Sequence, residues 1–82
     1  MFNRSLFEQK VAQSSLTMNE IAWKMGINAA TLYRKKAGES DFTRAEIQRI
    51  STILSLTWEE VVAIFFADEL EETQVLKHGA SA

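Results

Sequence analysis

Hydrophobic residues recur every three to four positions along most of the chain, and no stretch alternates between hydrophobic and polar positions over the length of a strand. This spacing is typical of α-helices that bury one face. No proline interrupts the pattern. We therefore predict an all-α protein, a compact five-helix bundle. Residues 1–67 form its folded domain, and residues 68–82 form an acidic C-terminal tail that is partly helical or disordered.

Helix starts are marked by a threonine with a glutamate three residues later, which occurs at Thr17/Glu20, Thr43/Glu46 and Thr57/Glu60. In such a capping box each side chain satisfies a backbone amide of the other residue. A further helix is expected over residues 3–14, with Phe7 and Val11 on its buried face. In the fourth helix the buried face carries Ile47, Ile50 and Leu54.

Two short helices joined by a tight corner are predicted between residues 17 and 37. Gly26 follows Met25 where a chain leaving a helix usually needs a positive φ, so the first of the two ends there. Asn28 can cap the second, in which Leu32 is the one large apolar side chain. The face of this helix opposite Leu32 presents small side chains and Arg34. Such a helix face can enter a DNA major groove.

The segment LTMNEIAWKMGINAATLYRK, residues 16–35, resembles the Cro/repressor-type (XRE-like) helix-turn-helix family of phage and bacterial regulators. Ala22, Gly26, Ile27 and Leu32 match its four structural positions, and TLYRKKAGESDFTRAEI looks most like small phage-encoded members. The resemblance covers roughly residues 5–66. It implies a lambda-repressor-like fold, a homodimer on a palindromic operator in double-stranded DNA, and transcriptional repression.

By the same resemblance, the base-facing positions are Ala29, Ala30 and Arg34. Residues implied to contact the DNA backbone are Asn28, Thr31, Lys35, Lys36 and Arg44. We add Tyr33, which flanks the outward face of the helix. Two interpretations stay open for some of these. Tyr33 either contacts phosphate or covers a neighbouring apolar surface, and the basic run at residues 34–36 either binds DNA or forms a solvated helix end that favours the helix dipole.

The 82 residues carry a net charge of −2, which by itself does not favour nucleic acid. The charges are unevenly distributed, however. Residues 1–50 contain eight basic and five acidic side chains, whereas residues 51–82 contain one basic and six acidic ones. A basic edge at residues 34–36 can therefore coexist with an acidic far end.

Helix five is apolar over more of its circumference than one small core requires, so we place a dimer interface at its edge, at Val62 and Phe66. Trp23 lies away from the buried face of its helix. We expect it to be half-buried over a neighbouring helix end, and the alternative is a contact with a protein partner.

Enzyme motifs, such as a glycine-rich phosphate loop or a nucleophile motif, are not found. There is no cysteine, and the single histidine, His78, stands in the tail without a cluster of metal ligands. We expect no enzyme, no cofactor and no metal. The N-terminus lacks an apolar stretch of signal-peptide or membrane-span length, which predicts a cytoplasmic protein.

Two functions fit these features. The first is a sequence-specific DNA-binding transcriptional regulator, a phage or prophage repressor. The alternative is a helix-turn-helix domain used as a protein-binding module, an antirepressor that captures another regulator.

Overall fold

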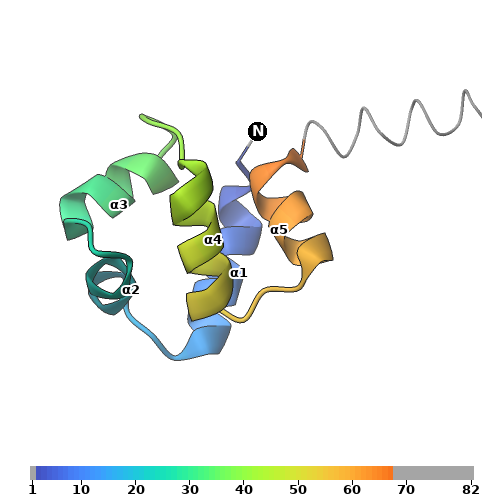
Figure 1. Ribbon diagram of the computed structural model, residues 1–82, viewed down its shortest axis with the longest axis horizontal. Coiled ribbons are helices and arrows are strands. Elements are labelled where there is room, and N and C mark those ends of the chain that lie inside the picture. The colour runs from blue at the N-terminus through green and yellow to red at the C-terminus, as the bar shows by residue number, and fades with distance from the viewer. Residues whose placement is uncertain (1, 68–82) are drawn as a thin grey trace, which may run out of the picture.

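The computed structural model describes residues 2–67, which contain five α-helices and no strand (Figure 1). The helices are α1 (Arg4–Ser14), α2 (Met18–Met25), α3 (Ala29–Lys36), α4 (Arg44–Ile53) and α5 (Trp58–Phe65). The prediction of an all-α, five-helix domain is confirmed. The predicted tail at residues 68–82, with His78, lies outside the described residues.

All three predicted capping boxes are present, at the starts of α2, α4 and α5. In α2, the amide of Glu20 donates to the Thr17 hydroxyl at 3.1 Å, and the amide of Thr17 donates to the Glu20 carboxylate at 2.9 Å. The remaining two helices, α1 and α3, are capped by the side chains of Asn3 and Asn28. The amide of Asn3 also donates to the Ile64 carbonyl at 2.7 Å, which ties the start of α1 to α5.

The corner between α2 and α3 forms at Gly26, whose φ of 76° is the left-handed value predicted for it. Its amide donates to the carbonyls of Ala22 and Trp23, which closes the end of α2. A side chain with a Cβ would be strained at this φ. From α4, the Arg49 guanidinium donates to the Met25 carbonyl at 3.1 Å, so the corner is also held by a neighbouring helix.

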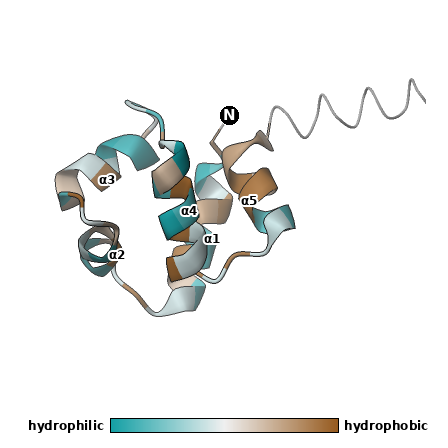
Figure 2. Ribbon diagram, in the orientation of Figure 1, coloured by the Kyte–Doolittle hydropathy of each residue, from teal (hydrophilic) through white to brown (hydrophobic). Residues whose placement is uncertain are grey.

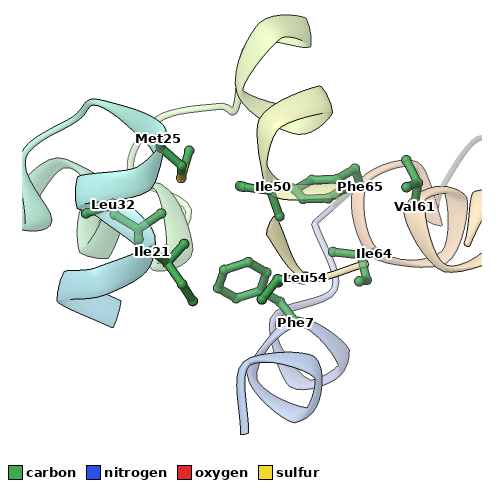
Figure 3. Packing of buried hydrophobic residues seen from close by; sticks show 10 residues of the cluster. Phe7, Ile21, Met25, Leu32, Ile50, Leu54, Val61, Ile64 and Phe65 are labelled. Carbon is green, nitrogen blue, oxygen red and sulfur yellow. The ribbon is translucent and has the colours of Figure 1, made fainter. Parts of the chain in front are cut away.

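A single hydrophobic core joins the helices, and its fully buried large side chains are Phe7, Ile21, Met25, Leu32, Ile50 and Ile64. Residues of α2 and α3 lie on one side of Phe7 and Ile50, and residues of α5 lie on the other (Figure 3). Phe7 is buried as predicted, whereas Val11 packs only partly against the core. The rings of Phe2, Phe42 and Phe65 pack around one another beside Phe7.

The capping glutamates make folding sensitive to acid. Hydrogen bonds from the Thr17 amide and hydroxyl hold the pKa of Glu20 below its usual 4.5. At Glu60, the Lys10 ammonium and then the Thr57 amide lower the pKa in the same way. A carboxyl group whose pKa is lowered by folding stabilises the fold fully above its unfolded value and loses that contribution as pH falls.

We therefore expect the melting temperature to be constant from about pH 7 to 5.5 and to fall as pH drops below about 4.5. Circular dichroism melts across this range measure it. Glu20→Gln serves as the matched variant, because glutamine keeps a capping oxygen but does not titrate. Its melting temperature should fall less steeply with acid than that of the wild type, and equal slopes would contradict a contribution from Glu20.

Candidate nucleic-acid interface

Helix α3 is attached to the core by one fully buried side chain, Leu32. The exposed residues of the helix include Ala30, Tyr33 and Arg34, and the exposed Asn28 precedes it. Hydropathy colouring shows that α3 becomes hydrophilic toward its C-terminal end, whereas α5 is hydrophobic over most of its length (Figure 2). The helix therefore turns one face to the core and the rest to solvent.

Ala30 and Arg34 are four residues apart and exposed, so they lie on the same outward face of α3. Among residues 2–67, Arg34 takes part in no ion pair. Ala29, the third residue predicted to face bases, is partly buried and packs against the core. Two of the three predicted base-facing residues are thus brought together, and the third is set back from them.

The Asn28 side chain accepts a hydrogen bond from the Ala30 amide at 2.8 Å, which confirms its predicted role as a helix cap. Thr31 is partly buried, and Arg44 is exposed in the first turn of α4. Asn28 is therefore accessible at the start of α3, and Arg44 is accessible at the start of α4.

Lys35 is held within the domain. Its ammonium lies 3.0 Å from the Glu46 carboxylate and donates to the Asp41 carbonyl at 2.8 Å. Only 11% of the Lys35 side chain and 12% of the Glu46 side chain are exposed. Burial raises the pKa of Glu46, but hydrogen bonds from the Thr43 amide and from Lys35 outweigh that effect, and the net pKa is lowered. This lysine joins α3 to the capping box of α4.

Lys36 is also paired, but with a more accessible partner. Its ammonium lies 3.0 Å from the carboxylate of Glu8 in α1, whose side chain is 47% exposed. The same ammonium stands 5.2 Å from the centre of the Tyr33 ring. A hydrogen bond from Lys36, together with its charge, lowers the pKa of Glu8.

The basic edge predicted at residues 34–36 is therefore smaller than its charge count suggests, because two of its three cations have carboxylate partners. The sequence shows that Glu8 and Glu46 are present but not that they face these lysines. The sequence identifies Glu46 as a capping residue of α4. It does not indicate that Glu46 also pairs with Lys35 of α3.

A groove of about 490 Å³ runs between α4 and α5. Its lining is mainly apolar, with polar side chains from α4, and comprises Phe42, Arg44, Ile47, Gln48, Ser51, Trp58, Val61 and Phe66. Phe66, predicted at the dimer interface, belongs to this lining and is half-buried, and Val62 is half-buried as well. Trp58 is 71% exposed. Among residues 2–67, the apolar surface of α5 that stays exposed thus includes Trp58, which the sequence prediction of the interface left out.

Trp23 is 80% exposed, so the expectation that it packs half-buried over a neighbouring helix end is wrong. It projects from the face of α2 opposite Ile21, Ala22 and Met25, and no other helix within residues 2–67 covers it. The alternative, a contact with a protein partner, stays a prediction.

Within residues 2–67, no group of histidine, cysteine, aspartate and glutamate side chains could hold a metal ion, and no helix is long and apolar enough to cross a membrane. The chain matches no family model, no curated protein and no solved structure.

Proposed function

We propose that the chain is a sequence-specific DNA-binding regulator of the repressor type, with the lambda-repressor-like arrangement of its five helices. In this proposal α2 and α3 form the helix-turn-helix, and α3 enters the major groove. The observation that carries the proposal is the exposed face of α3, where Ala30 and Arg34 stand together, opposite Leu32, the one fully buried side chain of the helix. Arginine can grip guanine there, and alanine can contact a thymine methyl group.

Contacts to the DNA backbone come from side chains at the edges of that face. Arg44 is exposed at the start of α4, and Asn28 is exposed at the start of α3. Helix N-termini suit phosphate because their backbone amides point outward and the dipole favours negative charge. Lys35 contributes less in this proposal, because its ammonium already holds Glu46 and Asp41.

Selection of duplexes from a randomised library by the purified full chain tests the function directly. We expect enrichment of a palindrome whose half-sites are centred about one helical turn apart. Affinity for a selected duplex should fall steeply between 50 and 200 mM salt, as expected when phosphate contacts release counterions. Failure to enrich any sequence, together with no binding to any duplex at 50 mM salt, would reject the proposal.

Binding to a palindrome calls for a dimer, and the groove between α4 and α5 is the apolar surface best suited to a second copy. Trp58 forms part of the groove wall and is also largely exposed to solvent. The same surface therefore carries a projecting side chain and a groove that could receive one. A two-fold symmetric interface brings the same patch of both subunits together, and it can seat each projection in the other subunit's hollow. The predicted Phe66 lies in this surface, and Val62 lies beside it on α5.

Trp58→Gln is expected to raise the dimer dissociation constant about tenfold or more, because exposed tryptophans at interface centres commonly dominate binding energy. Trp23→Gln makes the same change at the other exposed tryptophan and should leave the dimer unaltered. Sedimentation equilibrium measures both. A wild type that is monomeric at tens of micromolar, or two variants that dissociate alike, would place the interface elsewhere.

The second candidate function is a protein-binding module that captures another regulator. It is favoured by Trp23, a large apolar side chain left 80% exposed on α2, and by the two lysines of α3 that are occupied within the domain. Exposed tryptophans are enriched where proteins bind one another. In this case Trp23→Gln would abolish capture of the partner, and the library selection would enrich nothing.

A further inference from the structure

The two lysines at the end of α3 have partners of different kinds. Lys35 and Glu46 are nearly buried, and Glu46 also caps α4, so separating them would open a helix start. Lys36 is 19% exposed and Glu8 is 47% exposed, and Glu8 caps no helix. Because nearly half of the Glu8 side chain is exposed, water can solvate its charge when the two part, and such a pair contributes less to stability than a buried one. The Lys36–Glu8 pair can therefore open without unfolding the domain.

The position of the pair suggests what replaces it. Lys36 is the last residue of α3, two positions beyond Arg34, and its ammonium lies at the end of a long flexible side chain. A DNA strand passing the C-terminal end of α3 would place phosphate oxygens within reach of that side chain. A carboxylate and a phosphate compete for the same ammonium by the same charge-assisted hydrogen bonds.

We propose that Glu8 takes the place of a DNA phosphate in the free protein. Its carboxylate pairs with the Lys36 ammonium there, and this pair must separate when DNA binds. This inference rests on the DNA-binding function proposed above. Each lysine that neutralises a phosphate normally releases about one counterion, which drives binding. When Lys36 leaves Glu8 to bind a phosphate, the free Glu8 carboxylate attracts a cation from solution. The net number of counterions released on DNA binding is therefore smaller. Glu8 thus lowers affinity for DNA of any sequence.

Glu8→Gln tests this role, since it keeps the size and a hydrogen-bonding oxygen and removes the charge. We expect the variant to bind a random duplex and a selected duplex more tightly, by roughly 3- to 10-fold at 100 mM salt, with a salt slope steeper by about one unit. Fluorescence anisotropy over a salt series gives both quantities. Circular dichroism melts should show that the variant is folded.

Two further variants isolate the pair. Glu59→Gln removes the same charge from an exposed position in the first turn of α5, and it controls for net charge alone. Lys36→Gln provides the background for a double-mutant cycle with Glu8→Gln. The gain from Glu8→Gln should vanish in that background, even though Arg4, 3.9 Å from Glu8, is still present.

The outcomes separate the two proposals. If the wild type binds DNA and Glu8→Gln gives no gain, or the gain equals that of Glu59→Gln, or it persists without Lys36, then Glu8 is not a competitor for Lys36 and the function stands. If only Glu8→Gln binds detectably, the inference is supported. If neither the wild type nor Glu8→Gln binds any duplex at 50 mM salt, both proposals fail.

Discussion

Leu32→Ala is expected to lower the free energy of unfolding by about 2 to 5 kcal/mol, the range for deleting a fully buried leucine side chain. Leu32 has no exposed surface and is the only fully buried residue of α3. The cavity would open between α3 and the rest of the core, where Ile21 and Met25 lie beside it (Figure 3). In a domain this small the loss is a large part of the total stability.

Urea unfolding followed by circular dichroism measures the effect of Leu32→Ala. Tyr33→Ala is the matched control, because it truncates the next residue of the same helix at a position that is 48% exposed. It should cost about 1 kcal/mol or less. Similar losses for the two variants would mean that α3 is not anchored through Leu32.

Arg34→Ala should weaken binding to the selected duplex by about 1 to 3 kcal/mol, or roughly 5- to 150-fold, and should hardly change binding to random DNA. The guanidinium is exposed, shares the outward face of α3 with Ala30, and has no carboxylate partner among the described residues. It is therefore available for a bidentate contact with guanine. Anisotropy titrations on both duplexes measure the difference.

Arg44→Ala is the comparison for Arg34, because it also removes an exposed arginine, at a position predicted to contact phosphate. It should weaken binding to both duplexes alike and reduce the salt slope by about one unit. Because Arg44 also lines the groove of the proposed dimer, sedimentation equilibrium must show that the variant is still dimeric. If Arg34→Ala behaves as Arg44→Ala does, Arg34 contacts the backbone and base reading lies with other residues.

The sequence predicted the helix starts and the corner well because their signals are local. A threonine and a glutamate three residues apart meet within a single helical turn, and Gly26 takes its left-handed φ from the ending of α2. The burial of Phe7 and Leu32 was also predicted, since Phe7 shares a helical face with Val11 and Leu32 is the one large apolar side chain on its face of α3.

The ion pairs could not be predicted in this way. Lys36 meets Glu8 across 28 positions of sequence, and only the folded chain brings the end of α3 within reach of this residue of α1. Trp23 illustrates the opposite error. A tryptophan is usually at least partly covered, but coverage needs a neighbouring helix, and none of the five described helices packs on that side of α2. The Lys36–Glu8 pair and the exposure of Trp23 both depend on how the helices are arranged in space, which local sequence patterns do not indicate.

The capping glutamates of α4 and α5 each serve a second helix. Glu46 closes the first turn of α4 and also receives Lys35 of α3, and Glu60 closes the first turn of α5 and also receives Lys10 of α1. Fraying of either helix start therefore loosens its neighbour, so α3 is linked to the start of α4, and α1 to the start of α5. Each of these carboxylates therefore serves two helices at once, and a substitution of Glu46 or Glu60 would weaken two helix ends rather than one.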